Sequence, residues 1–344
     1  MSSGILRPTV KRLLALGGLR LVRIERGDSA RGPNREASPP EAPGPFSPPA
    51  IHPSLAFAPP GHFYSPIPDL AEVERKSGLL FATDPRDLPG IDIREAQQLE
   101  LLEQCVDFYR EQPFTAGRTE ANRYFFENPA YSYSDAIFYY LMLRRYRPRR
   151  LIEVGSGYST CIALDTRERF LNGSPEITCI EPYPELVRSL MRPSDAQRVT
   201  IRAEALQEAP LSLFESLGEN DVLFIDSTHV SRIGSDVNRL FFEILPRLRP
   251  GVLIHVHDVF YPFEYPRHWV MEGRAWNEIY VLRAFLEFND RFEIVLFNTY
   301  LTQNQRPFIQ ERFPLCLANE GGSLWFRRVG VGLDGEGVRA KVSA

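Results

Sequence analysis

The sequence has few cysteines, no long apolar run and no strong excess of charge. Its four cysteines, Cys105, Cys161, Cys179 and Cys316, are scattered, which predicts reduced core residues in a cytoplasmic protein. No apolar run approaches the roughly 20 residues needed to cross a bilayer. A formal net charge of -4 gives no reason to expect a nucleic acid as partner. At 344 residues with 43% hydrophobic content, the chain can bury one substantial α/β core.

The first 60 residues carry little that could form a core. Residues 1–36 are basic with interleaved apolar residues, a pattern that suits weak contact with an anionic membrane surface. Gly17 and Gly18 interrupt that pattern, and no signal-peptide cleavage pattern follows it. Residues 32–60 are rich in Pro, Ser, Gly and Ala, so they cannot offset the entropy of ordering. We therefore predict a disordered leader over residues 1–60.

The stretch that organises the chain is RLIEVGSGYS, residues 150–159. Its short β-branched run predicts a buried parallel strand, and Gly155 and Gly157 allow the backbone to turn tightly against a ligand. A helix beginning at Tyr158 would turn free N–H groups toward this loop, where a nucleotide-like ligand can bind. A dinucleotide fingerprint requires a third glycine where this chain has Thr160, which argues against NAD.

The remaining chain alternates between strand and helix patterns. Such alternation predicts an α/β, Rossmann-like, doubly wound sheet whose ligand crevice lies beyond the carboxyl ends of the strands. Helices on both faces and an N-terminal helical extension would cover it. Strands are expected over residues 151–154, 176–180, 199–202, 222–225, 252–257, 292–297 and 323–327. Helices are expected over residues 93–111, 135–145 with Ser134 as cap, 158–164, 185–191, 211–217, 237–248 and 278–288.

Ionisable side chains follow three of these strands. Glu181 ends the second strand, where a carboxylate can accept hydrogen bonds from ribose hydroxyls. Asp226 and His229 follow the fourth strand, and His257 and Asp258 end the fifth. Because strands four and five are neighbours in this fold, we expect Asp226, His257 and Asp258 to converge at the crevice, with His229 just above them.

This cluster supports two mechanisms, and the residues alone leave both open. A neutral His229 can take a hydroxyl proton as general base, because its unperturbed pKa lies near neutral. Alternatively, Asp226, His257 and Asp258 can hold one divalent ion, with oxygen donors favouring Mg²⁺ or Mn²⁺. The aromatic, Pro- and Gly-punctuated loop of residues 259–277 would serve as a lid, an acceptor wall or a hydrophobic cap.

The E-V-G-S-G loop, followed by an acid after the next strand, resembles the first motif of class I S-adenosylmethionine-dependent methyltransferases. The run from IDSTHV to HVHDVF and GRAWNE resembles the methyltransferase 24 type, and the likeness extends from residues 62–69 to residues 321–328. It implies a methyltransferase catalytic domain over residues 148–328, an N-terminal strap and helical cover over 61–147, and a flexible tail over 329–344.

The resemblance also implies a cofactor and a reaction. The cofactor is S-adenosyl-L-methionine, and the acceptor is a hydroxyl of a small molecule or glycan. Metal-dependent O-methyltransferases of similar fold take acids from these strand ends, but His257 stands where they usually have an oxygen ligand. Two other hypotheses are a metal-dependent hydroxylase or hydrolase and a non-catalytic nucleoside-binding module. The oligomeric state stays open. The implied cofactor contacts are Glu153, Gly155, Ser156, Gly157, Tyr158, Glu181, Glu204, Ala205 and Asp226.

Overall fold

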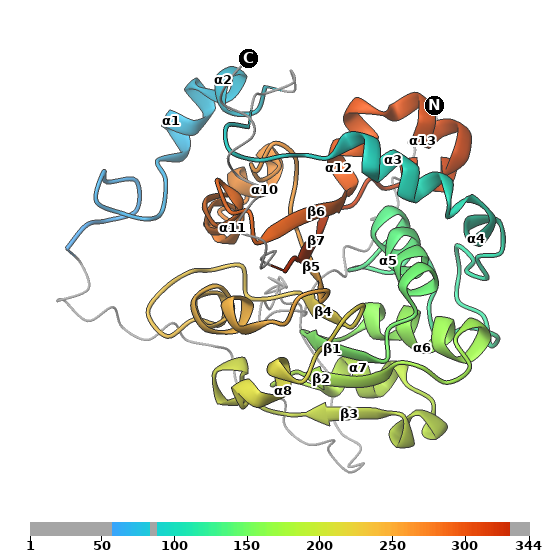
Figure 1. Cartoon of the computed structure of the whole chain (residues 1–344). Helices are drawn as coiled ribbons and strands as arrows, with labels where there is room; N and C mark the ends of the chain where they lie inside the picture. The colour runs from blue at the N-terminus through green and yellow to red at the C-terminus, as the bar shows by residue number, and fades with distance from the viewer. Residues whose placement is uncertain (1–56, 83–87, 331–344) are drawn as a thin grey trace, which may run out of the picture. The chain divides into compact units, whose positions relative to one another are not determined.

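The computed structural model describes residues 57–82 and 88–330 (Figure 1). The basic segment predicted to contact membranes lies outside the described residues, as do most of the predicted leader and the tail beyond residue 330. The chain divides into two compact units, Met1–Leu80 and Phe81–Ala344. Among the described residues, no helix combines the length and the apolar character needed to span a bilayer.

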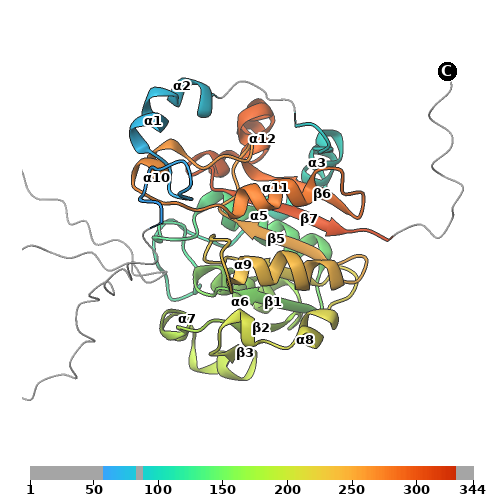
Figure 2. The ribbon, with the colours of Figure 1, turned by 90° about the vertical axis from the view of Figure 1, so that its left-hand side faces the viewer.

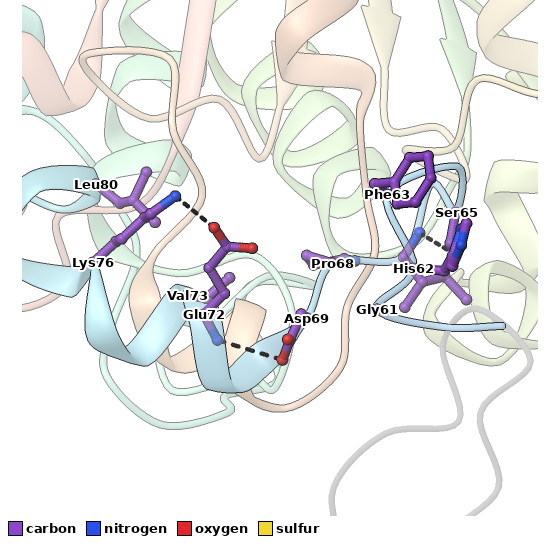
Figure 3. Close-up of a pocket in the computed structure, with 11 residues that line it drawn as sticks. Gly61, His62, Phe63, Ser65, Pro68, Asp69, Glu72, Val73, Lys76 and Leu80 are labelled. Carbon is purple, nitrogen blue, oxygen red and sulfur yellow. Dashed lines mark hydrogen bonds and ion pairs between the residues drawn. The ribbon is translucent and has the colours of Figure 1, made fainter. Parts of the chain in front are cut away.

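In the part of the first unit that the structure describes, residues 57–80, there are two short helices, α1 (Leu70–Arg75) and α2 (Ser77–Leu80). Residues 62–69 form turns and bends, as the two prolines predict. Asp69 then caps α1, because its Oδ1 accepts hydrogen bonds from the backbone N–H groups of Ala71 and Glu72. Figure 3 shows a pocket of about 290 Å³ in this unit. It is lined by residues 61–80 alone, so it contains none of the predicted site residues.

The second unit is built on a seven-stranded sheet in the order β3-β2-β1-β4-β5-β7-β6. The first five strands are parallel, and β7 runs antiparallel to both β5 and β6. The predicted Rossmann-like sheet is therefore confirmed, with each predicted strand found within a residue of its expected ends. The strands are β1 Arg150–Val154, β2 Glu176–Ile180, β3 Val199–Arg202, β4 Val222–Ile225, β5 Leu253–His257, β6 Phe292–Phe297 and β7 Ser323–Arg328.

Helices cover both faces of this sheet (Figure 2), since alternate strand residues point into two different cores. Leu151 and Phe224 pack into the core beneath α5 and α6, whereas Ile152 and Leu223 pack into the core beneath α8 and α11. The bounds are α3 Glu95–Glu103, α4 Val106–Arg110, α5 Tyr133–Tyr146, α6 Tyr158–Phe170, α7 Glu185–Leu190, α8 Leu211–Glu215, α9 Asp236–Arg239, α10 Arg267–Met271, α11 Glu278–Leu286, α12 Asn298–Asn304 and α13 Arg306–Arg312.

Several predicted helices differ from the observed ones. The helix expected over residues 93–111 is divided into α3 and α4. Helix α5 begins after Ser132, so Ser134 is its second residue and not its cap. The helix expected over residues 237–248 continues from α9 into a π-helical turn, Leu240–Ile244, and a 3-10 turn. The four cysteines are free and buried, as predicted.

Candidate active site

Gly155 lies where the carboxyl ends of β1, β2 and β4 meet. Its φ is +78°, a left-handed conformation that favours glycine. Its N–H donates to the carbonyl of Ile180 at the end of β2 at 3.1 Å. A Cβ on Gly155 would lie 2.2 Å from the backbone carbonyl oxygen of Asp226, just after β4. The loop between β1 and α6 therefore lies directly against the segment that begins the ionisable cluster.

Glu181 meets the same loop from β2. One carboxylate oxygen accepts a hydrogen bond from the backbone N–H of Ser156 at 3.1 Å, and the other accepts from the N–H of Tyr183 at 2.8 Å. Burial raises the pKa of Glu181, while these two hydrogen bonds act against that rise. The structure thus brings Glu181 together with the glycine loop, the arrangement that its predicted contact with a ribose requires.

Glu153 does not face the crevice. Its side chain is fully buried, and it accepts a hydrogen bond from the hydroxyl of Thr160 at 2.5 Å. That hydroxyl in turn accepts a hydrogen bond from the backbone N–H of Gly157 at 3.2 Å. The carboxyl group therefore lies in the core and supports the glycine loop through Thr160, and the predicted contact between Glu153 and a cofactor stays a prediction.

His229 lies at the centre of the ionisable cluster. Its Nδ1 is 2.9 Å from Oε2 of Glu278, which is buried at the start of α11. Its Nε2 is 3.4 Å from Oδ1 of Asp226 and 3.4 Å from Oδ2 of Asp258. Nε2 of His257 lies 3.4 Å from the other Asp258 oxygen, Oδ1. The side chains expected to converge from the ends of β4 and β5 are thus in contact.

The backbone at this cluster is itself unusual. His229 has a φ of +60° and Asp258 a φ of +57°, both in the left-handed region that non-glycine residues seldom adopt. The carbonyl of His229 accepts hydrogen bonds from the N–H groups of Asn277 and Glu278, which hold it in this conformation. Such strained positions concentrate at functional sites, because only a strong local requirement maintains them.

The carboxylates keep His229 charged. Burial alone would lower its pKa, but hydrogen bonds to Asp226 and Glu278 and the charge of Asp258 raise that pKa well above 6.5. Burial likewise opposes the ionisation of Asp226, yet the hydrogen bond from His229 and the charge of His257 lower the pKa of Asp226 below its usual value. These neighbours therefore favour the protonated imidazole, and the predicted role of His229 as a general base stays a prediction.

Glu278 is the residue that the sequence analysis missed. It lies 49 positions from His229 and was expected only to begin a helix. Its Oε2 also accepts a hydrogen bond from the hydroxyl of Ser227 at 2.8 Å, and that hydroxyl accepts one from the N–H of His229. Glu278 therefore fixes both the ring and the backbone of His229. Its sequence signal was its place at the end of the GRAWNE motif, which was quoted for the family resemblance without a role for the acid.

His255 and His257 share one face of β5, as the period of two predicts, but their surroundings differ. His255 is fully buried and stacks on Phe224 with ring centroids 4.2 Å apart. Burial and the neighbouring charge of His257 lower its pKa well below 6.5, so it belongs to the core. Burial would lower the pKa of His257 too, but the charges of Asp258, Asp226 and Asp135 raise it.

A family model described as a methyltransferase domain, the methyltransferase 24 type, matches residues 152–259, which span the glycine loop, Glu181, Asp226, His229 and Asp258. The chain belongs to the class I methyltransferases of this type. An uncharacterized protein from Archaeoglobus fulgidus is 38% identical to the methyltransferase over 169 residues, which cover 47% of this chain and 74% of that protein.

Solved methyltransferase structures resemble it more distantly. The O-methyltransferase TomG from Streptomyces achromogenes, in complex with SAM, is 17% identical, with 76% of this chain and 96% of that chain covered and a TM-score of 0.39. The SAH-bound methyltransferase PaMTH1 from Podospora anserina is 16% identical, with 77% and 98% covered and a TM-score of 0.37.

The side chains of the predicted metal site are engaged with histidines. Both oxygens of Asp258 already face imidazole nitrogens, and the Asp226 oxygen nearest the cluster faces His229. Within residues 57–82 and 88–330, no three His, Cys, Asp or Glu side chains are arranged to hold a metal ion. The metal site predicted at Asp226, His257 and Asp258 stays a prediction, as does the metal-dependent hydroxylase or hydrolase that would use it.

The other predicted cofactor contacts lie at the same edge of the sheet. Glu204 is bound to Nε of Arg202 at 2.5 Å, and Ala205 precedes a 3-10 turn after β3. Tyr158 begins α6, with its ring edge-on to Phe125. No observed contact tests the predicted roles of Glu204, Ala205 and Tyr158, so these stay predictions.

The buried carboxyl of Glu153 should make stability depend on pH. Burial raises its pKa from 4.5 to about 7, partly offset by hydrogen bonds from Thr160 and Cys179. The unfolded chain therefore loses this proton before the folded one, and stability falls as pH rises from about 4.5 through 7, by roughly 3 kcal/mol. We expect Glu153→Gln to resist unfolding better than the wild type at pH 8.5 and to match it at pH 4.5.

Urea unfolding at the two pH values measures this difference. Glu208→Gln, which changes an exposed acid, is the matched control and should follow the wild type throughout. A Glu153→Gln variant that is less stable than the wild type at pH 8.5 would show that the carboxylate form is the one the core requires.

Proposed function

We propose that this methyltransferase transfers a methyl group from S-adenosyl-L-methionine to a hydroxyl of a small molecule or glycan. The donor would lie along the glycine loop, with the hydroxyls of its ribose bonded to Glu181. Two observations support this: Glu181 contacts Ser156 at 3.1 Å, and the space beside Gly155 is too narrow for any side chain. Asp226 touches the same loop, so the donor and the His229 cluster would share one crevice.

The observation that carries the proposal is the contact of His229 with Glu278 on one ring nitrogen and with Asp226 and Asp258 on the other. A carboxylate on Nδ1 fixes the ring and its tautomer, so that Nε2 is the atom that exchanges a proton with the crevice. An acceptor hydroxyl beside Nε2 would displace the loose 3.4 Å contacts with the two aspartates.

The proposed reaction needs no reactant besides the methyl donor and the acceptor. The bound donor supplies a methyl group on a sulfonium. As the bond between that carbon and the acceptor oxygen forms, the carbon–sulfur bond breaks and the hydroxyl proton passes to Nε2 of His229. His229 must first lose the proton that its carboxylate neighbours hold on it, so the reactive form is populated above its raised pKa.

The aromatic loop supplies a wall for the acceptor. Trp276 lies against the ring of His229, with centroids 4.4 Å apart, and Trp269 meets Trp276 edge-on at 5.5 Å. The guanidinium of Arg274 lies 4.2 Å from the Trp269 ring and pairs with Glu272. Faces of this kind suit a sugar or an aromatic ring that carries the reacting hydroxyl.

Calorimetry with S-adenosylhomocysteine tests the donor site. We expect the wild type to bind this product and Glu181→Ala to bind it at least a hundredfold more weakly, because two charge-assisted hydrogen bonds to the ribose are lost. Glu185→Ala, which removes an exposed acid from α7, is the matched control and should bind like the wild type. If the wild type does not bind S-adenosylhomocysteine, the proposed function is wrong.

A further inference from the structure

The cluster around Asp258 has one feature that the proposed reaction does not require. Its two oxygens each face the Nε2 of a different histidine at 3.4 Å, His229 on Oδ2 and His257 on Oδ1. Asp226 turns Oδ1 toward the same His229 nitrogen. Nε2 of His229 thus lies 3.4 Å from carboxylates of two neighbouring strands, which is where a divalent cation could bind both of them.

Glu278 holds His229 in that position through the other ring nitrogen, Nδ1. Its Nδ1 faces Glu278 at 2.9 Å, and with carboxylates at both nitrogens the ring serves as a donor on each side. Glu278 is 1% exposed, and its Oε2 also accepts from Ser227. Trp276 covers the ring at 4.4 Å. If the imidazole swung aside to admit an ion, the buried carboxylate of Glu278 would keep only its hydrogen bond from Ser227, which is costly.

We propose that His229 occupies the place of a divalent metal in this site, so that the methyltransferase binds no metal between Asp226 and Asp258. The side chain that takes the acceptor proton also supplies the positive charge that keeps the two carboxylates together. Removal of the imidazole should then leave a pair of facing carboxylates with His257 beside them, and this set would accept a divalent ion. The activity measurements below rest on the proposed function, whereas the Mn²⁺-binding measurements do not.

The first test uses the wild-type protein and Mn²⁺ alone. Electron paramagnetic resonance counts free Mn²⁺ during a titration, and we expect no saturable binding below about 1 mM. Activity should be unchanged by EDTA. One Mn²⁺ bound per chain at micromolar concentrations, or loss of activity in EDTA that Mn²⁺ restores, would overturn the inference. Neither result depends on donor binding, which calorimetry with S-adenosylhomocysteine reports separately.

The second test uses His229→Gly, because glycine accepts the φ of +60° and empties the space between the carboxylates. We expect this variant to bind Mn²⁺ at least tenfold more tightly than the wild type, and His229→Gly/Asp258→Asn to lose that gain. A folded His229→Gly that binds Mn²⁺ no better than the wild type would overturn the inference. His229→Asn, which also tolerates this φ, replaces it if the glycine variant does not fold.

Discussion

Replacing His229 with alanine is expected to lower kcat by roughly a hundredfold or more, while the affinity for S-adenosylhomocysteine changes little. The imidazole is the group in the cluster that can accept the hydroxyl proton. Of the residues expected to hold the donor, it contacts Asp226, whose carboxylate stays in place when the imidazole is removed. Loss of the imidazole should therefore raise the barrier to transfer without removing donor contacts. Steady-state kinetics and calorimetry measure the two effects.

Two comparisons make the His229 experiment specific. His268→Ala removes an exposed histidine in α10 and should keep wild-type activity. In the wild type we expect kcat/KM to rise with pH above pH 6.5, as His229 loses its proton. Glu278→Gln removes a carboxylate that raises the pKa of His229, so this rise should occur at lower pH in the variant. Equal losses of kcat and donor affinity in His229→Ala would instead assign His229 a structural role.

The sheet could be predicted nearly residue by residue because parallel strands buried on both faces leave a plain pattern. Runs such as Val222–Ile225 are short, apolar and bounded by turn residues, a pattern that a buried strand fits and a helix does not. Helices α12 and α13 were not predicted. They are seven residues each, and α13 has a proline in its first turn, so their helical pattern is too brief to stand out from the loop around them.

The site was predictable to the extent that strand ends determine it. Asp226 and Asp258 each follow a strand, and neighbouring strands bring them together whatever the rest of the chain does. The charge on His229 and its place between the carboxylates depend on Glu278, which reaches the site through the packing of α11. No spacing in the sequence encodes that contact, so the sequence alone left both a general base and a metal site open.

Replacing Gly155 with alanine is expected to abolish donor binding and to destabilise the fold by about 3 kcal/mol or more. The new Cβ would lie 2.2 Å from the carbonyl oxygen of Asp226, and backbone atoms cannot rotate away as a side chain can. The φ of +78° adds strain for any L side chain. The loop must therefore shift away from β4, which separates Ser156 from Glu181.

Gly157→Ala is the matched control, because it changes the other glycine of the same loop. Gly157 has an extended φ of 178°, and its Cβ would meet only Cδ2 of Leu186 at 3.1 Å, an atom that can give way. We expect it to change stability by no more than about 1 kcal/mol. Thermal melts of both variants separate the two positions, and calorimetry with S-adenosylhomocysteine measures donor binding by Gly155→Ala. If Gly155→Ala bound the product as tightly as the wild type, the donor could not lie along this loop.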